Sequence, residues 1–200
     1  MALPLKKPTL AEFLAWENSQ PARSEFYRGE VFLMVGASRV HGLVAGNLFA
    51  ALKSHLKGTP CRAFIESMKV QAAGDATFYP DVFVTCDTSD LKTDMVFRSP
   101  TLVAEVLSES TQAYNRGLKF AAYRQLASLR EYLLIDPDTR QVEVFQRNER
   151  SNFELLDQTG SAELVLASVG LRLPMAELFD GVDDGLDAQP EGSVQASPGT

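Results

Sequence analysis

The chain has 200 residues, 45% of them hydrophobic and 22% charged, with a formal net charge of -7 at pH 7. This composition is typical of a globular protein with one sizeable core, and it gives no support for a broadly basic nucleic-acid-binding chain. No apolar run approaches the roughly 20 residues needed to span a bilayer, and the N-terminal sequence MALPLKKPTL lacks the apolar segment of a signal peptide, so we expect a cytoplasmic protein without a membrane span.

The N-terminal part of the chain predicts a helix, a hairpin and a second helix. In TLAEFLAWENS, Thr9 is followed three residues later by Glu12, which is the spacing of a helix capping box. SEFYRGEVFLMVG predicts two short strands around Arg28 and Gly29, where a glycine suits a tight turn. An apolar stripe then predicts a helix over residues 42–57 that packs on a sheet. The members of this stripe are Leu43, Val44, Leu48, Leu52 and Leu56.

The rest of the chain predicts a sheet with one more helix. Extended runs at CRAFIESMKVQ and TFYPDVFVTC precede LVAEVL, residues 102–107, whose apolar side chains at both parities predict a strand covered on both faces. A helix is expected over TQAYNRGLKFAAYRQLASL, followed by strands in REYLLIDP and RQVEVFQR that form a hairpin at the sheet edge. The order of elements predicts an α/β fold with a mixed central sheet flanked by helices.

The end of the chain differs in composition from the rest. From Val182 to Thr200 it consists largely of Asp, Gly, Ser, Pro and Gln, which predicts a disordered acidic tail after a single domain at residues 1–181. The tail holds four acidic residues and no Lys or Arg, so 22 of the 26 acidic residues and all 19 basic residues belong to the domain. The domain therefore shows no basic excess that would indicate a nucleic-acid groove.

The two cysteines carry no metal-binding or redox motif. Cys61 and Cys86 lie 25 residues apart, without a CxxC pattern and without a histidine at ligand spacing. We therefore expect both to be reduced packing residues, and neither a zinc site nor a disulfide is predicted.

Glu105 is an ionisable residue in the middle of the predicted buried strand. Burying an unpaired carboxylate costs several kcal/mol or more, so one that stays ionised normally has a cation, a metal or several donors beside it. Asp81 follows Pro80 and heads the preceding strand run, and adjacent strands can bring both carboxylates together at the rim of the sheet. Mg²⁺ is usually held by one or two carboxylates, with waters and substrate phosphate oxygens completing its coordination.

Regular geometry places Lys119 near Glu105. The strand advances roughly 10 Å over the three residues after Glu105, at about 3.3 Å each, and a helix that begins near Thr111 returns about 12 Å by Lys119, at about 1.5 Å per residue. If the helix runs antiparallel to the strand, Lys119 returns to the level of Glu105. Asn115, Lys119 and Tyr123 would then form one polar face directed at the glutamate.

Each of these residues also has a simpler interpretation. Glu105 could form a structural ion pair with Arg98 or Arg124, because buried charges are often simply paired. Lys119 could be a solvated helix residue. Asp81 could cap the turn that follows the proline, which is a common role for aspartate.

Two other polar patterns predict no site. Asp136 and Asp138 flank a proline at the end of a strand and are expected only to make a turn. The glycines at positions 36, 42 and 46 match neither phosphate-loop spacing, so a nucleotide-binding loop is not predicted.

Taken together, YPDVFV and PTLVAEVLSESTQAYNRGLKFAAYRQLASLREYLLIDP resemble the Uma2 family of restriction-endonuclease-like proteins, whose fold belongs to the PD-(D/E)XK nuclease superfamily. SEFYRGEV and SRVHGLVAGNL are looser matches in the expected order, so the resemblance covers the chain up to about Val182. It implies a restriction-endonuclease-like mixed central sheet with additional N-terminal and C-terminal strands. It also implies that Asp81, Glu105 and the backbone carbonyl of Val106 hold Mg²⁺ or Mn²⁺.

The resemblance assigns further site residues. The superfamily lysine is expected two residues after the glutamate, where this chain has Leu107, and Lys119 resembles the lysine that Uma2 proteins carry on the following helix. Asn115 stands where family members have aspartate. Glu25 matches the N-terminal glutamate of the family and His41 matches its histidine, so both are further catalytic candidates, although Glu25 also suits a surface hairpin and His41 a helix start.

The first hypothesis is therefore a metal-dependent endonuclease that hydrolyses DNA, and a homodimer would suit the cutting of both strands. The alternative is a nuclease-fold binding or assembly module without activity, which the acidic balance of the chain and Asn115 favour. A third hypothesis is a metal-dependent phosphoesterase that acts on a smaller substrate.

Overall fold

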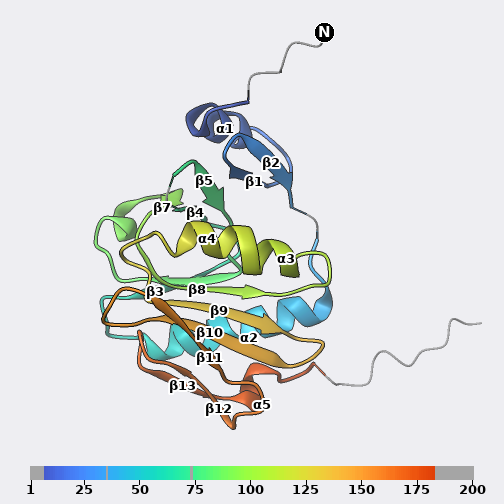
Figure 1. The fold of residues 1–200 in the computed structure, drawn as a ribbon, viewed down its shortest axis with the longest axis vertical. Coiled ribbons are helices and arrows are strands. Elements are labelled where there is room, and N and C mark those ends of the chain that lie inside the picture. The colour runs from blue at the N-terminus through green and yellow to red at the C-terminus, as the bar shows by residue number, and fades with distance from the viewer. Residues whose placement is uncertain (1–6, 35, 73, 183–200) are drawn as a thin grey trace, which may run out of the picture.

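The structure is a computed structural model that describes residues 7–34, 36–72 and 74–182. Within these ranges the strands form a five-stranded N-terminal sheet in the order β2-β1-β5-β4-β7, a six-stranded central sheet in the order β11-β10-β9-β8-β6-β3, and a two-stranded β12-β13 hairpin (Figure 1). The helices are α1 (Leu10–Glu17), α2 (Arg39–His55), α3 (Gln112–Tyr114), α4 (Phe120–Tyr123) and α5 (Met175–Leu178), with a 3₁₀ turn at Asp90–Lys92 and a π-helical turn, η2, at Asn115–Lys119. The N-terminal sheet contains β1 (Ser24–Tyr27), β2 (Glu30–Leu33), β4 (Lys69–Ala72), β5 (Ala76–Phe78) and β7 (Val96–Phe97). The other strands are β3 (Arg62–Ile65), β6 (Val82–Thr85), β8 (Pro100–Val106), β9 (Glu131–Asp136), β10 (Gln141–Arg147), β11 (Phe153–Asp157), β12 (Glu163–Leu166) and β13 (Leu171–Pro174).

The N-terminal helix and hairpin form as predicted. The Thr9 hydroxyl accepts from the backbone N–H of Glu12 at 3.2 Å, and the Glu12 carboxylate accepts from the backbone N–H of Thr9 at 2.7 Å, which completes the capping box. The β1-β2 turn contains Arg28 and Gly29 with φ of 48° and 84°. Two successive positive φ values are what a two-residue hairpin turn requires.

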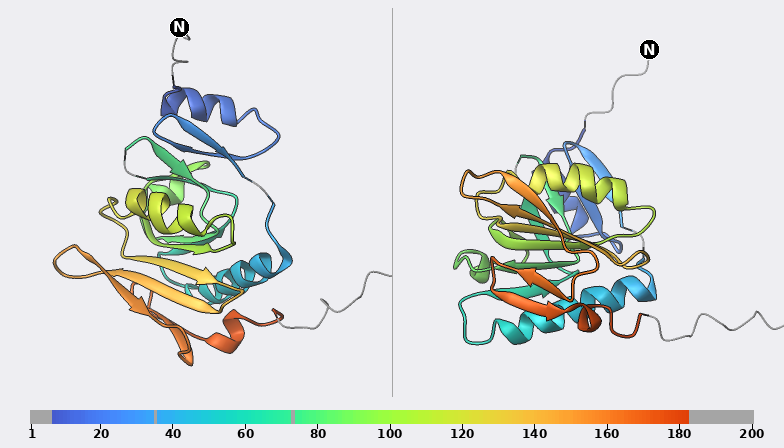
Figure 2. Two further views of the ribbon diagram at one scale, coloured as in Figure 1. Left: turned by 45° about the vertical axis from the view of Figure 1, so that its right-hand side comes forward. Right: turned by 60° about the horizontal axis from the view of Figure 1, so that its bottom comes forward.

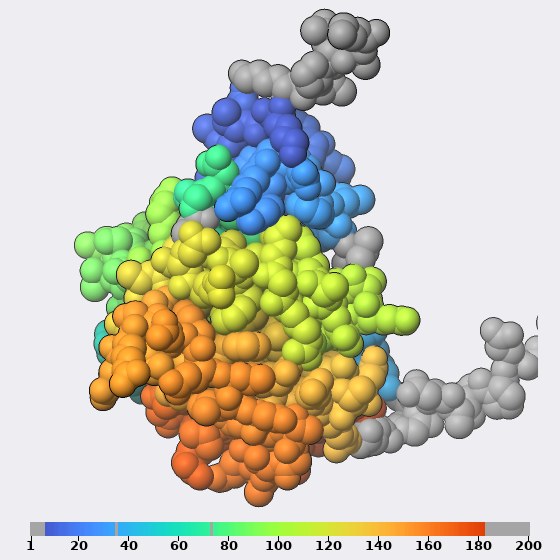
Figure 3. All heavy atoms as spheres, viewed as in Figure 1, coloured from blue at the N-terminus to red at the C-terminus, as the bar shows by residue number. Residues whose placement is uncertain are grey.

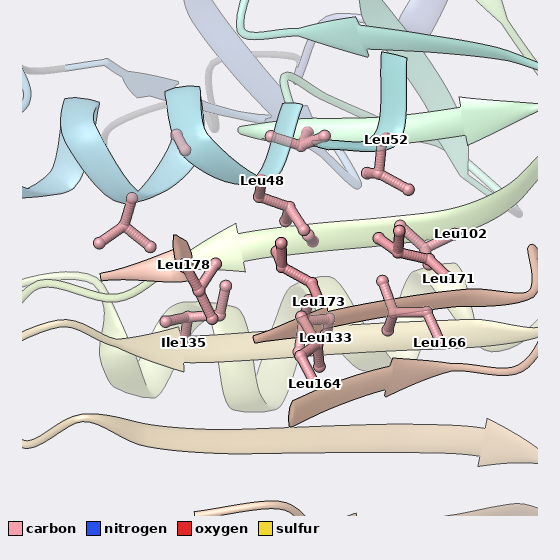
Figure 4. Packing of buried hydrophobic residues seen from close by; sticks show 14 of the residues in the cluster. Leu48, Leu52, Leu102, Leu133, Ile135, Leu164, Leu166, Leu171, Leu173 and Leu178 are labelled. Carbon is pink, nitrogen blue, oxygen red and sulfur yellow. The ribbon is translucent and has the colours of Figure 1, made fainter. Parts of the chain in front are cut away.

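The α2 helix covers one face of the central sheet. It begins after Ser38, whose hydroxyl accepts from the backbone N–H of His41 at 3.2 Å, so it starts three residues before the predicted range of 42–57. Its apolar stripe packs against the sheet and the β12-β13 hairpin to form an aliphatic core (Figure 4). The main members of the aliphatic core are Leu48, Leu52, Leu102, Leu133, Ile135, Leu164, Leu166, Leu171, Leu173 and Leu178.

The opposite face of the central sheet is covered by the segment α3-η2-α4 and by the N-terminal sheet (Figure 2). An aromatic core lies between these layers. Its members include Phe78, Phe83, Phe97, Val103, Leu107, Tyr123, Leu129, Tyr132 and Leu134. In the space-filling view the segment 112–123 forms a yellow-green band between the N-terminal hairpin and the strands β10 and β11 (Figure 3).

The central sheet is mixed, as predicted. The β6 and β8 strands pair antiparallel, with Val82 opposite Ala104, whereas β8 and β9 pair in parallel, with Glu105 opposite Leu134. The β9-β10 hairpin also forms, and the Asp136 carboxylate accepts two backbone N–H groups of its turn, at 3.0 and 3.1 Å. The predicted edge position of this hairpin is wrong, because β11 pairs with β10 and takes the edge.

The helix that follows β8 contains an irregular turn. The backbone N–H of Phe120 donates to the carbonyl of Asn115, five residues back, so the middle of the predicted helix is a π turn. The Tyr132 hydroxyl donates to the same carbonyl at 3.0 Å, which ties this turn to β9. Short π segments within α-helices are frequent at functional sites.

The two cysteines correct the sequence prediction. Cys61 and Cys86 form a disulfide, so the expectation of two reduced residues is wrong. In the antiparallel β3-β6 pair Arg62 lies opposite Thr85, and the residues just beyond this pair are the two cysteines. The bond depends on the pairing of two strands, which local motif spacing does not reveal.

The described chain ends at Val182, the first residue of the predicted tail. Its N–H donates to the carbonyl of Phe179 at 3.2 Å, and its side chain packs on the aliphatic core. The remaining residues of the predicted tail, 183–200, lie outside the described residues. Among the helices that the structure describes, none is long and apolar enough to cross a membrane.

Candidate active site

Glu105 and Lys119 meet as the strand and helix geometry predicted. Glu105 lies on β8 and is 1% exposed, and Lys119 lies at the end of the π turn and is 5% exposed. The Lys119 Nζ is 3.2 Å from both carboxylate oxygens of Glu105. The interpretation of Lys119 as a solvated helix residue is therefore wrong. So are the proposed arginine partners, because Arg98 donates to Gln71 and the Arg124 guanidinium lies over the ring of Phe120.

Glu25 joins this pair from the N-terminal sheet. Its Oε1 is 2.9 Å from the Lys119 Nζ and also accepts the backbone N–H of Tyr79 at 3.0 Å. The ammonium group further lies 5.8 Å from the ring centre of Phe78 and 5.6 Å from that of Tyr114, distances at which a cation is attracted to an aromatic face. Lys119 is thus held between two carboxylates and two rings, and the surface role considered for Glu25 is wrong.

Asp81 lies near Glu105 because it directly precedes β6, the antiparallel neighbour of β8. Its Oδ2 accepts the backbone N–H of Val106 at 2.7 Å and is 3.2 Å from the Nε2 of His41. The side chain of Asp81 is therefore bound to β8 and to the first turn of α2. The interpretation of Asp81 as a cap for its own turn does not hold for this side chain.

The buried carboxylates determine the electrostatics of the cluster. Burial raises the pKa of Glu105 well above its usual value, the positive charge of Lys119 opposes this, and the negative charges of Asp81 and Glu25 add to it. Burial alone would lower the pKa of Lys119, but Glu105, Glu25 and Asp81 outweigh it and raise that pKa. Two carboxylates thus contact one ammonium group and a third acts on it through its charge, so the cluster favours the uptake of a proton or another cation.

His41 belongs to the partly exposed side of the cluster. Burial lowers its pKa, but the hydrogen bond and the charge of Asp81, the charge of Glu66 and the backbone carbonyl of Val106 together outweigh burial and raise it. The carbonyl that the sequence analysis expected to bind a metal therefore acts on His41 here, while the N–H of the same residue binds Asp81.

Several buried polar atoms at the cluster have no hydrogen-bond partner among the described residues. They are the His41 Nδ1, the Asn115 Oδ1 and the Tyr123 hydroxyl. The pKa of Tyr123 is raised by burial and then by the charges of Glu105 and Glu25, so its hydroxyl lies within the field of the carboxylates. Unsatisfied buried polar groups are rare in folded proteins and call for an explanation, which a bound ion, water or substrate would supply.

A sequence model of the Uma2 family, described as "Putative restriction endonuclease", matches residues 10–176. The chain belongs to the Uma2 family. Two sequences from Synechocystis sp. are similar to this chain over most of their length. The uncharacterized protein slr1290 is 32% identical over 90% of this chain and 95% of its own, and the uncharacterized protein sll1609 is 34% identical over 70% and 80%.

A solved structure has the same fold as this Uma2 chain. It is the crystal structure of a protein described as a putative nuclease belonging to DUF820, from Anabaena variabilis, with 22% sequence identity, a TM-score of 0.71 and coverage of 86% of this chain and 97% of that chain. The predicted fold class, an α/β fold with a mixed sheet flanked by helices and with additional strands at both ends, is confirmed.

The side chains around Lys119 are not arranged as a metal-binding site. Among residues 7–34, 36–72 and 74–182, no group of three or more His, Cys, Asp or Glu side chains is arranged to hold a metal ion. Lys119 binds Glu25 and Glu105, and His41 binds Asp81. In the structure the two carboxylates expected to bind a metal contact Lys119 and His41.

A second buried ion pair was missed by the sequence analysis. Lys69 on β4 is 3% exposed and its Nζ lies 2.6 Å from the Oε2 of Glu17, at the end of α1. The other carboxylate oxygen of Glu17 accepts the hydroxyl of Tyr79 at 2.7 Å. Lys69 lies within a predicted extended run, and a lysine in such a run could have indicated a buried ion pair. Its partner could not be predicted, because Glu17 lies on another element far away in the sequence.

Proposed function

We propose that this Uma2 protein is a divalent-metal-dependent endonuclease that hydrolyses phosphodiester bonds of DNA and acts as a homodimer. The observation that carries the proposal is the cluster in which Glu25 on β1 and Glu105 on β8 contact Lys119, while Asp81, just before β6, adds a third negative charge. The description of the family and that of the structural neighbour both name nucleases, and they support the same reaction class.

The donor set of the cluster fits Mg²⁺ or Mn²⁺. Carboxylate oxygens are the ligands that Mg²⁺ prefers. Burial is the main cause of the raised pKa of Glu105, and the negative charges of Asp81 and Glu25 add to it, so a divalent cation beside them would favour the ionised carboxylate. Asp81 and Glu105 would hold the metal, together with the carbonyl of Val106. When bound, such a metal polarises the scissile phosphate and lowers the pKa of a coordinated water.

Lys119 would stabilise the negative charge that develops on the phosphoryl oxygens, or position the attacking water, as preorganised cations do in such reactions. In the structure it bridges Glu105 and Glu25. Because Glu25 also binds the lysine, Lys119 would keep one anionic partner if Glu105 bound a metal. Glu25 would therefore hold the lysine in place.

His41 would hold Asp81. Its Nε2 and the backbone N–H of Val106 both contact the Asp81 Oδ2, at 3.2 and 2.7 Å. This would leave the Asp81 Oδ1 available to bind a metal. His41 is thus a positioning residue in this proposal.

The test is cleavage of supercoiled plasmid by the purified full chain with Mn²⁺ or Mg²⁺. We expect the wild type to nick or linearise the plasmid, and Asp81→Ala, Glu105→Ala and Lys119→Ala each to lower the rate on the order of a thousandfold, equivalent to about 4 kcal/mol in the activation barrier. Asp136→Asn is the control, because Asp136 is a buried aspartate at the end of β9 whose carboxylate accepts N–H groups of its own turn. Its rate should match the wild type. An inert wild type, or variants that cut equally well, would refute the proposal.

The second candidate is a nuclease-fold module that binds DNA without cutting it. The pairing of all three carboxylates with Lys119 or His41 favours this function, since a paired carboxylate is stable without a metal. A chain of this kind would bind DNA with an affinity that falls steeply with salt. It would show no cleavage, and Lys119→Ala would leave the DNA affinity unchanged.

A further inference from the structure

The buried Lys69–Glu17 pair connects the first helix to the N-terminal sheet. The Lys69 Nζ contacts the Glu17 Oε2 at 2.6 Å and donates to the Asn18 Oδ1 at 2.6 Å. Both charged side chains are almost fully buried, at 3% and 5% exposure. A buried ion pair often stabilises a fold no better than apolar residues of similar size would, so this pair calls for a role other than stability.

Tyr79 connects this pair to the proposed active site. Its hydroxyl donates to the Glu17 Oε1 at 2.7 Å, and its backbone N–H donates to the Glu25 Oε1 at 3.0 Å. The same oxygen of Glu25 lies 2.9 Å from the Lys119 Nζ. One residue therefore joins the outer ion pair to the carboxylate that holds the lysine.

Two further features fix the position of Tyr79. The Arg23 guanidinium lies 5.6 Å and the Lys69 Nζ 5.9 Å from its ring centre, so two cations face the ring. Pro80 follows directly, and its ring restricts the backbone that leads into Asp81. Anchoring the tyrosine side chain thus constrains both Glu25, through the N–H, and the start of the segment that carries Asp81.

We infer that Tyr79, held by the Glu17–Lys69 pair, is a positioning residue that sets the place of Glu25 and thereby of Lys119. This inference rests on the proposed nuclease function for its effect on the reaction, but its effect on Glu25 and Lys119 is independent of that function. The Glu17–Lys69 pair therefore lies outside the active site and acts on it through Tyr79.

The test uses Tyr79→Phe in the full chain, which removes the hydroxyl and keeps the ring and the backbone N–H. Tyr27→Phe is the matched control, because it removes a hydroxyl from a half-buried tyrosine of β1, which pairs with the strand β5 that leads into Tyr79. We expect Tyr79→Phe to weaken Mn²⁺ binding in calorimetry and to slow plasmid cleavage by about tenfold, the effect of losing one hydrogen bond to a charged group. Tyr27→Phe should change neither.

A double-mutant cycle separates positioning from a general loss of stability. In a Glu25→Gln background, Tyr79→Phe should cause no further loss of Mn²⁺ affinity or cleavage rate, because the group it positions is already altered. Independent losses that multiply in the double variant would overturn the inference. A charge-neutral pair, Glu17→Gln with Lys69→Gln, leaves no unpaired buried charge and should reproduce the effect of Tyr79→Phe.

Thermal unfolding distinguishes failure of this inference from failure of the proposed function. If the wild type neither binds Mn²⁺ nor cuts DNA, the nuclease proposal fails, yet Tyr79→Phe and Glu25→Gln should still give non-additive shifts in Tm. Additive shifts in that case would overturn the positioning role itself.

Discussion

The two faces of the central sheet are built from different kinds of side chains. The face under α2 is covered by the aliphatic core, in which leucine, valine, alanine and isoleucine predominate and Phe179 is the one buried aromatic residue among those described. The face under α3-η2-α4 is covered by the aromatic core, and Glu105 and Lys119 lie at its side. The face under α2 buries apolar side chains, which is favourable. The face under α3-η2-α4 also buries charged groups, which must be paired to avoid a large free-energy cost.

A single strand contributes to both faces. Along β8 the side chains of Leu102, Ala104 and Val106 belong to the aliphatic core, while Val103 and Leu107, the residue after β8, belong to the aromatic core. Because successive side chains of a strand point to opposite faces, Glu105 points to the aromatic side. The alternation of this strand therefore separates the groups that stabilise the fold from the group proposed to do chemistry, and substitutions on the two faces should have different effects.

The largest effect on stability is expected from Lys119→Met. It leaves Glu25 and Glu105 buried without their shared cation, so the free energy of unfolding should fall by about 4 kcal/mol at pH 7. Urea unfolding at pH 7 and pH 5 would measure this, and the loss should shrink at pH 5 because the raised pKa of Glu105 favours uptake of a proton there. Lys57→Met, at an exposed lysine after α2, should stay within about 0.5 kcal/mol of the wild type. An equal loss in the two variants would contradict the difference between the faces.

Leu48→Ala tests the aliphatic core directly. Leu48 is fully buried between α2 and the sheet, and the cavity left by the substitution should lower the free energy of unfolding by about 3 kcal/mol. Denaturant unfolding measures this loss, and calorimetry should show unchanged Mn²⁺ affinity below the unfolding transition. A weakened affinity would mean that the two faces are coupled through β8.

The pH dependence of Mn²⁺ binding tests the aromatic side. Because the pKa of Glu105 is raised, the carboxyl group stays protonated to a higher pH than usual and Mn²⁺ must displace the proton. Below that pKa the affinity should rise about tenfold per pH unit for one displaced proton and level off above it. In the absence of metal, the folding stability has the opposite pH dependence to the Mn²⁺ affinity. The stability that protonated Glu105 contributes is present at low pH and is lost as the pH rises through its folded-state pKa. An affinity that is constant between pH 5 and 8 would contradict this assignment.

The smallest effect is expected from His41→Gln, at the partly exposed side of the cluster. The pKa of His41 is raised in the folded protein, so its charged form stabilises the fold below its unfolded value of about 6.5, and this contribution is lost as the pH rises through the folded-state value. The variant should lose about 1 kcal/mol of stability at pH 6 and little at pH 9. In an Asp81→Asn background the difference at pH 6 should disappear, and a difference that persists would show that Asp81 is not the partner that matters.

Local regularity explains what the sequence could predict. Glu105 and Lys119 are joined by one strand, one turn and one helix, and the fixed rise of each element was sufficient to bring the two side chains to the same level. Asp81 was predictable from the likelihood that successive strands pair. The capping box of α1 and the turn at Gly29 needed only residues close in sequence.

The missed contacts depend on how distant elements pack. Tyr79 and Glu17 are 62 residues apart, and Lys69 lies 51 residues from Asn18, so no spacing rule relates them. The disulfide likewise depends on the pairing of β3 with β6. These contacts follow from the way the N-terminal sheet docks on the central sheet, which sequence periodicity does not specify.

The π turn at Asn115–Lys119 has a consequence for how this chain is compared with its relatives. A π turn accommodates one more residue than an α-helical turn would, so it is equivalent to a single inserted residue within a helix. A deletion at Gly117 would restore regular winding and rotate the following side chains by about 100° relative to those before it. The lysine would then turn away from the glutamate even though every residue named in the site was still present. For this protein the length of the segment between Glu105 and Lys119 is therefore as much a part of the site as the identity of the two residues.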